Sequence, residues 1–258
     1  MNQANQSKPY LKSSASGAST MRFPCFEVSG DGRQCRTVDL ADKDSYQHPN
    51  KHLPKLLAMC SGHGRRIPQV TVVRGQKLFA SSRPSHRVMF AESYTEHLHL
   101  LELEADLAGV LYFDTQPLSI LVSDRRYTPD MLVVKEHSVV LQEIKEASFK
   151  QTRQWLDQFE RQRNHFRDLG FDDLELKLID CSSIRYKKLS ALHRWAKEFC
   201  PEFLETIPQG YAGTVNDLWG EFNREPNALG KIYASVFFGF LKYESTERCC
   251  LDTVVTFA

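Results

Sequence analysis

The residues best suited to chemistry are two acids and a lysine, Asp130, Glu143 and Lys145, in a segment rich in β-branched residues. Side chains of a strand alternate between its two faces, so Glu143 and Lys145 point the same way. A hairpin turn at Glu136-His137 places Asp130 directly opposite Glu143, and opposed residues share a face with Cβ atoms about 5 Å apart. The sequence therefore predicts one surface that carries all three groups.

Two carboxylates at that separation repel each other, and a divalent cation is the usual compensation. Oxygen ligands of this kind suit Mg²⁺ or Mn²⁺. We therefore predict a Mg²⁺ site, with Mn²⁺ as the other suitable ion, whose ligands are Asp130, Glu143 and the carbonyl of Ile144. The alternative is that Asp130 caps a turn and that Glu143 and Lys145 form an exposed ion pair on an edge strand.

A further acid comes from the first strongly helical segment, residues 89–105, which is apolar on two opposite faces. A helix of this kind is sandwiched between layers. Glu96 lies on one of the apolar stripes with Leu100 and Leu103, so its carboxylate is partly desolvated unless something pairs with it. We expect Glu96 to complete the metal site or to hold a second ion.

The elements that must position these residues indicate an α/β fold with a mixed central sheet flanked by helices. The expected elements after the first helix are β-rich runs at 109–113, 118–123, 127–134 and 138–145, a helix over 149–169, a strand over 174–179 and a helix over 186–199. The expected divisions are a disordered leader over 1–20, an N-terminal extension over 21–65, the core domain over 66–204 and a small helical C-terminal domain over 205–258.

Charge is unevenly distributed along the 258 residues, although the net charge is only +1. Residues 51–90 contain eight Lys or Arg and no acid, whereas residues 91–146 contain eleven acids and four basic residues. A basic arm beside an acidic centre suits a protein that holds a polyanion and a divalent cation together, and a solvated basic surface is the alternative. The predicted phosphate contacts are Arg65, Arg66, Arg83, Arg87, Lys150 and Arg153.

Other classes of protein fit the sequence less well. No apolar stretch approaches the about 20 residues of a membrane span, and the N-terminus lacks the apolar part of a signal peptide. The seven cysteines are odd in number and sparse, which argues against a secreted disulfide framework. We therefore expect a cytoplasmic protein with no membrane partner. Zinc at Cys25, Cys35, Cys60 and His63 is a lesser alternative, because their spacing lacks the close pairs of structural zinc sites.

Pro129-Asp130 followed by Glu143-Ile144-Lys145 resembles the restriction-endonuclease-like superfamily, whose signature is Pro-Asp…Asp/Glu-x-Lys. More narrowly, residues 92–145 resemble TnsA, the endonuclease subunit of heteromeric cut-and-paste transposases. In that family a helix with a catalytic Glu and a second acid eight residues later leads to a Gln-Pro turn. The corresponding residues here are Glu96, Glu104 and Gln116-Pro117.

The resemblance implies a restriction-endonuclease-like core and carries the helix carboxylate onto Glu96, the central metal ligand onto Asp130 and the catalytic lysine onto Lys145. The best-known TnsA has Gln at the position of Glu143, whereas Glu matches the wider superfamily and adds a charge to the metal site. The implied activity is Mg²⁺-dependent cleavage of DNA at the 5′ ends of a transposon. The implied partners are transposon-end DNA, a DDE-type (TnsB-like) transposase and an AAA+ (TnsC-like) regulator, in a prokaryotic cytoplasm and at the nucleoid when bound to DNA.

Two other functions stay open. One is a defence or repair nuclease with the same core, and the other is a catalytically silent DNA-binding subunit in which the acids and Lys145 merely pair. Residues 201–258 carry a net charge of −4 and many aromatic side chains. An acidic surface gains nothing from phosphates, so we expect residues 205–258 to dock a protein partner.

Overall fold

The computed structural model describes residues 24–28, 35–40, 42, 46–61, 77–81, 83, 88–244 and 248–257. The predicted leader over 1–20 lies outside the described residues, and so do the predicted phosphate contacts Arg65, Arg66 and Arg87. His63 and the side chains of Cys25 and Cys35 also lie outside them, so the zinc alternative has only Cys60 within the described part.

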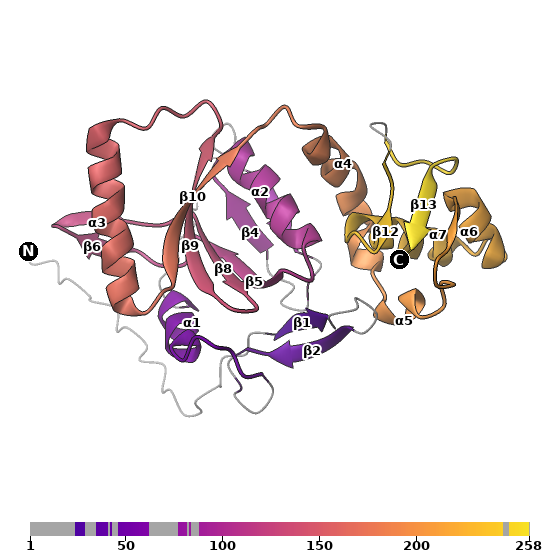
Figure 1. Ribbon diagram of the computed structural model, residues 1–258, viewed down its shortest axis with the longest axis horizontal. Coiled ribbons are helices and arrows are strands. Elements are labelled where there is room, and N and C mark those ends of the chain that lie inside the picture. Colours follow the sequence, from indigo (N-terminus) through magenta and orange to yellow (C-terminus); the bar gives the residue numbers. More distant parts are fainter. Residues whose placement is uncertain are drawn as a thin grey trace, which may run out of the picture.

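A mixed sheet of four strands forms the centre of the fold, in the order β10-β9-β8-β5 (Figure 1). Its strands are β5 (Val110–Thr115), β8 (Met131–Lys135), β9 (Val139–Glu146) and β10 (Asp173–Ile179). β5, β8 and β9 are antiparallel neighbours, and β10 runs parallel to β9. The predicted mixed sheet with flanking helices is thus confirmed.

The register between β8 and β9 decides where the acids lie. Val134 pairs with Val139 and Met131 pairs with Gln142, so the predicted hairpin register is confirmed. Asp130 directly precedes β8 and lies opposite Glu143 in this register. Pairing between β8 and β9 ends at Met131, while pairing between β9 and β10 continues to Glu146. The end of β9 therefore extends beyond β8, where the sheet narrows.

Helices cover both faces of the sheet, which explains why its central strands are apolar on both sides. One face packs against α2 (Tyr94–Ala105) and α4 (Ile184–Leu192), through buried residues that include Val133 and Ile144. The other face packs against α1 (Leu53–Ser61) and α3 (Arg153–Leu169), through residues that include Leu132, Leu141 and Phe166. The result is a three-layer arrangement (Figure 1).

The predicted helix over 89–105 is wrong at its start. Val88–Ala91 is strand β4, which pairs with β3 (Lys77–Ala80) in an antiparallel hairpin. The helix begins after Ser93, whose hydroxyl accepts a hydrogen bond from the Glu96 N–H at 3.1 Å. This side-chain cap satisfies one of the unpaired amides of the first turn and fixes where the helix starts.

Two further hairpins lie outside the central sheet. β1 (Pro24–Val28) and β2 (Cys35–Asp39) pair in antiparallel fashion, and so do β6 (Ile120–Val122) and β7 (Arg125–Tyr127). The β6–β7 turn consists of Ser123 and Asp124, both with positive φ, at 48° and 64°. Two successive residues of this conformation make the tight turn that matches the twist of a hairpin.

The C-terminal part contains the expected helices and also a small sheet that the sequence did not predict. Its helices are the 3-10 helix η1 (His193–Glu198), α5 (Pro201–Leu204), α6 (Val215–Glu221) and α7 (Pro226–Phe237). Its strands β11 (Ala212–Thr214), β12 (Leu241–Lys242) and β13 (Val254–Phe257) form a sheet in the order β11-β13-β12. Strands this short give no recognisable alternation.

The aromatic side chains of this C-terminal part mainly build its own core. Tyr233, Phe237 and Phe238 are buried in one cluster with Leu192 and Ala196 from the preceding helices. Within the described ranges, no helix has both the length and the apolar character needed to cross a membrane.

Candidate active site

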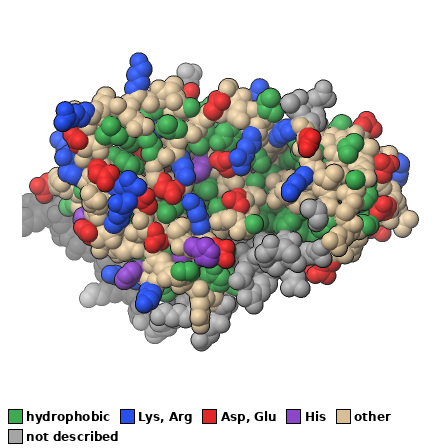
Figure 2. Space-filling view, in the orientation of Figure 1, with side chains coloured by type: hydrophobic (Ala, Val, Ile, Leu, Met, Phe, Trp, Pro, Cys, Tyr) green, Lys and Arg blue, Asp and Glu red, His purple; other side chains and the backbone are tan. Residues whose placement is uncertain are grey.

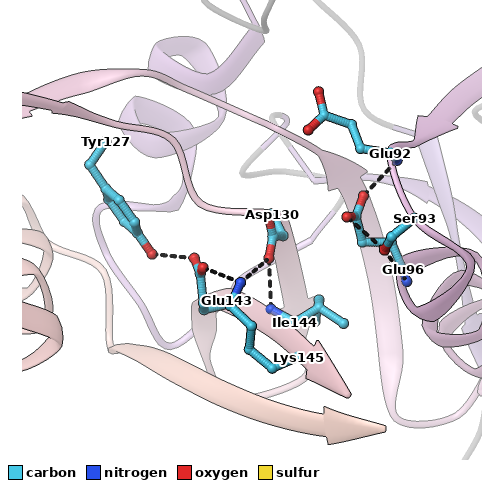
Figure 3. A network of polar contacts seen from close by, with 8 residues as sticks. All are labelled: Glu92, Ser93, Glu96, Tyr127, Asp130, Glu143, Ile144 and Lys145. Atoms are coloured by element: carbon cyan, nitrogen blue, oxygen red, sulfur yellow. Dashed lines mark hydrogen bonds and ion pairs between the residues drawn. The ribbon is translucent and has the colours of Figure 1, made fainter. Parts of the chain in front are cut away.

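The structure brings Asp130, Glu143 and Lys145 together where the sheet narrows (Figure 3). The Lys145 ammonium lies 2.6 Å from Glu143 Oε1 and 3.9 Å from Asp130 Oδ2. The predicted common face is therefore confirmed. The side chains are 20%, 13% and 29% exposed for Asp130, Glu143 and Lys145, so the cluster is partly buried but open to solvent on one side.

Asp130 is held by backbone groups on both sides. Its Oδ2 accepts a hydrogen bond from the Ile144 N–H at 2.7 Å, and its carbonyl accepts one from the Gln116 N–H at 2.8 Å. Ile144 lies beyond the last residue of β9 that pairs with β8, so the Asp130 carboxylate satisfies an amide that the shorter strand leaves exposed. This bond fixes the direction in which the carboxylate points.

Glu143 is oriented by Tyr127, a residue that the sequence analysis did not assign to the site. The Tyr127 hydroxyl donates to Glu143 Oε2 at 2.5 Å, while Lys145 occupies the other carboxylate oxygen (Figure 3). The ring of Tyr127 packs 5.9 Å from that of Phe166 on α3. No local motif marks Tyr127, because its contact with Glu143 depends on how the β6–β7 hairpin folds against the sheet.

Burial and like charge set the electrostatics of the acids. Burial, followed by the charge of Glu143, raises the pKa of Asp130 to about 7, although the Ile144 N–H and Lys145 act in the opposite direction. Burial lowers the pKa of Lys145, but its hydrogen bond to Glu143 and the surrounding carboxylates outweigh burial, and the pKa is raised overall. A buried acid whose ionised form is opposed by a neighbouring carboxylate marks a site that favours additional positive charge.

The donor set fits a hard divalent cation. Asp130 and Glu143 supply carboxylate oxygens on one face, which is what Mg²⁺ and Mn²⁺ prefer. Among the described residues, no group of three His, Cys, Asp or Glu side chains is close enough to hold one metal ion. The two carboxylates are therefore the candidate protein ligands here, and the Ile144 carbonyl as a further ligand stays a prediction.

Glu96 does not join the other two acids in this arrangement (Figure 3). Its carboxylate accepts hydrogen bonds from the Glu92 N–H at 2.8 Å and the Ser93 hydroxyl at 2.9 Å. This is a variant of the capping box, and the Ser-x-x-Glu spacing in the sequence is its signature. Burial raises the pKa of Glu96, while the charge of Lys145 lowers it, so the two residues interact electrostatically. The metal-binding role of Glu96 stays a prediction.

Glu104 and Arg83 have structural roles. Glu104 is fully buried, accepts a hydrogen bond from the Ser81 hydroxyl at 2.8 Å and lies 3.7 Å from Arg83 Nε. The Arg83 guanidinium also donates to the carbonyls of Leu103, Glu104 and Asp106 at the end of α2 and of Val110 at the start of β5. Arg83 is only 3% exposed, so it is buried in a helix-capping position rather than on the surface, where the predicted phosphate contact would need it.

Lys150 and Arg153 are the predicted phosphate contacts that the structure does describe on the surface. Both are exposed; Lys150 lies in the loop after β9 and Arg153 is the first residue of α3. They follow the Glu143–Lys145 strand directly along the chain, so a phosphate contact next to the acids remains a prediction for them.

A second polar network, which the sequence analysis also missed, lies on the α2 face of the sheet. His99 Nε2 lies 2.7 Å from Gln142 Oε1, and the Gln142 amide donates to Glu175 at 2.9 Å. His99 and Gln142 are 4% and 1% exposed, so their mutual hydrogen bond satisfies one polar atom of each away from solvent. Gln142 points away from Glu143, as strand alternation predicts, and joins β9 to α2 and β10.

Comparison of the chain with protein-family models and with curated proteins gives no match. The function must therefore be argued from the geometry of the acids, the lysine and their surroundings.

Proposed function

We propose that the chain is a Mg²⁺-dependent DNA endonuclease in which Asp130, Glu143 and Lys145 are the catalytic residues. The observation that carries the proposal is the meeting of two carboxylates and an ammonium at the narrow end of the sheet, with Lys145 Nζ 2.6 Å and 3.9 Å from the two acids. Acids that repel each other in a partly buried site are costly to keep, and cation binding is the chemistry that compensates for them.

Hydrolysis of a phosphodiester needs an in-line water, neutralisation of developing charge and stabilisation of the leaving oxygen. Bound Mg²⁺ would supply charge neutralisation and lower the pKa of a water molecule. Asp130 and Glu143 hold the cation, and Tyr127 keeps the Glu143 carboxylate in place. Lys145 has movable donors on a flexible stem, so it positions the attacking water and contacts the scissile phosphate.

The arrangement of the elements supports a nuclease core of the restriction-endonuclease-like kind. A helix, three antiparallel strands, a crossover helix and a parallel strand occur in the chain order α2, β5, β8, β9, α3 and β10, with the β6–β7 hairpin inserted between β5 and β8. The Pro-Asp and Glu-x-Lys residues lie where β8 begins and β9 ends, on one face. We extend the proposal to a TnsA-like subunit that cuts the 5′ ends of a transposon beside a DDE-type transposase and an AAA+ regulator.

The distribution of surface charge fits separate surfaces for DNA and for a protein partner. On the face in Figure 2, acidic side chains predominate at the end that carries α6 and α7, while most Lys and Arg side chains lie over the rest, interspersed with acidic ones. We propose that DNA binds over the sheet and α3, and that residues 205–258 bind a protein partner. A defence or repair nuclease would use the same residues.

One observation favours a different class of function. Lys145 already contacts both acids, so the cluster is partly neutralised without a cation. In a catalytically silent DNA-binding subunit, the two acids would serve only to form this ion pair with Lys145.

A DNA cleavage assay in Mg²⁺ separates these functions. One arm contains the chain, the transposase partner and labelled duplex DNA with transposon ends, and the other contains the chain alone with plasmid DNA. The proposal expects cleavage that EDTA abolishes and that Asp130→Ala removes while DNA binding persists. Asp252→Ala, at an exposed position of the C-terminal part, is the matched control and should cleave normally. DNA binding without cleavage in either arm would favour the silent subunit and contradict the proposal.

A further inference from the structure

A polar groove lies between the β6–β7 hairpin and α3, with a volume of about 420 Å³. The two elements lie side by side at the edge of the molecule opposite the C-terminal part (Figure 1). The hairpin contributes Arg125 and Arg126, and α3 contributes residues spaced along one helical face. The polar side chains from the helix are Gln154, Gln158, Arg161 and Gln162.

The groove is positively charged without compensation. Three guanidinium groups line it, from Arg125, Arg126 and Arg161, and no acidic residue does. All three arginines are exposed, and within the described part of the chain none of their side chains has a hydrogen-bond or ion-pair partner. By contrast, Arg163 on the other side of the same helix is paired with Asp173 through two bonds of 2.6 Å. The groove arginines therefore remain available to an anion.

Gln162 adds a hydrogen-bonding group to the same groove. It is only 6% exposed and lines the groove, yet its amide has no hydrogen-bond partner among the described residues. Its amide atoms are not sealed from solvent, so they open into the groove and are available to a group that arrives from outside. An amide both donates and accepts, which suits the oxygens of a sugar–phosphate chain.

Tyr127 connects this groove to the acid cluster. It lines the groove, and its hydroxyl donates to Glu143 at 2.5 Å, so the groove and the cluster lie on either side of one side chain (Figure 3). A strand held in the groove would therefore continue directly towards the carboxylates. Arginine forks match phosphate oxygens in pairs, and arginines on two separate elements fit an extended backbone better than a single small anion.

We propose that the groove between the β6–β7 hairpin and α3 binds the phosphate backbone of DNA next to the scissile position. This inference rests on the proposed nuclease function, because the proposed cleavage site defines which stretch of backbone is held. Contacts of this kind position the duplex without reading its sequence. The same groove would also help to orient Glu143, because Tyr127 forms part of its wall.

The test measures binding of a fluorescent duplex by anisotropy in EDTA, where cleavage cannot occur, at several salt concentrations. The double variant Arg125→Gln/Arg161→Gln removes one charge from each wall, and Arg224→Gln/Arg248→Gln removes two exposed charges from the C-terminal part as the matched control. Each lost phosphate contact should reduce the slope of log K against log salt by about 1, so the groove variant should lose about 2 and the control about 0. The loss should be equal for an unrelated duplex sequence.

Gln162→Leu separates a ligand-binding role from a structural one. The proposal expects weaker DNA binding with a nearly unchanged melting temperature, since the amide has no hydrogen-bond partner among the described residues and Leu is of similar size. The groove assignment is wrong if Gln162→Leu lowers the melting temperature but leaves DNA affinity unchanged, or if the arginine variants keep the wild-type salt slope. Normal DNA cleavage in those same variants would leave the nuclease proposal standing. If the arginine variants have a smaller salt slope but the wild type never cleaves DNA, the groove assignment is supported and the nuclease proposal is contradicted.

Discussion

Replacing Asp130 with Asn should stabilise the metal-free protein, although it removes the proposed metal site. Burial and the neighbouring Glu143 raise the pKa of Asp130 from the ordinary 3.8 to about 7. An acid whose pKa is higher in the folded state costs stability as pH rises from the unfolded pKa through the folded pKa. Asp130 should therefore make the metal-free wild type less stable between about pH 4 and pH 8, and the Asn variant should lack this contribution.

The magnitude follows from the same values. One pKa unit corresponds to about 1.4 kcal/mol, so the difference between 3.8 and about 7 gives an upper limit of about 4 kcal/mol above pH 8. Asn keeps an oxygen for the Ile144 N–H but makes a weaker, neutral bond, and Lys145 loses one of its two acids. We expect a net gain of about 1–3 kcal/mol in the free energy of unfolding at pH 8, falling to about zero at pH 4.

Urea denaturation in EDTA across this pH range measures the effect, and Asp173→Asn is the matched control. Asp173 also lies on the sheet, but its hydrogen bonds with Arg163 lower its pKa. Its stabilisation is present above the unfolded pKa and is lost as pH falls, so Asp173→Asn should cost about 1–2 kcal/mol at pH 8. If Asp130→Asn destabilises the protein at pH 8, as the control does, then burial next to Glu143 does not raise the pKa of Asp130 and the reasoning is refuted.

Three further substitutions test the surroundings of the site. Tyr127→Phe should lower Mn²⁺ affinity about tenfold in a metal titration with little change in melting temperature, because the hydroxyl only orients Glu143; an unchanged affinity would exclude that role. Gln142→Leu should cost about 1–3 kcal/mol in urea denaturation by removing the hydrogen bonds of Gln142 to His99 Nε2 and to Glu175, and the Gln142→Leu/His99→Leu double variant should cost less than the sum. Arg83→Met should cost about 3–5 kcal/mol because it leaves the Glu104 carboxylate buried without its cation, whereas an effect on DNA affinity alone would indicate that Arg83 is exposed in solution.

The central part of the site could be predicted because it depends on short-range rules. The alternation of β9 places Glu143 and Lys145 on one face, and a two-residue turn in the β8–β9 hairpin fixes the residue opposite Glu143. Both rules act within sixteen residues of chain and hold whatever packs around them. The mixed sheet followed similarly from the order of apolar segments.

What could not be predicted depends on contacts between distant segments. Tyr127 reaches Glu143 only because the β6–β7 hairpin folds back against the sheet, and His99 meets Gln142 only because α2 packs there. In the sequence, nothing distinguishes Arg83 from an arginine on the surface, and only the packing of β3 against α2 shows that it is buried. The start of α2 was misplaced although Ser93 and Glu96 carry the capping spacing, since only Glu92 and Ser93 separate the apolar run of β4 from the helix.

The most direct test of the account is Mn²⁺ binding, measured by electron paramagnetic resonance, to the chain in complex with a DNA duplex. Lys145→Ala removes the ammonium that neutralises the acids, so this variant should bind Mn²⁺ at least as tightly as the wild type while cleaving no DNA. Asp130→Asn/Glu143→Gln should lose the site. If the wild type and Lys145→Ala bind no more Mn²⁺ than the double variant does, the acids do not hold a catalytic cation and the proposed function is contradicted.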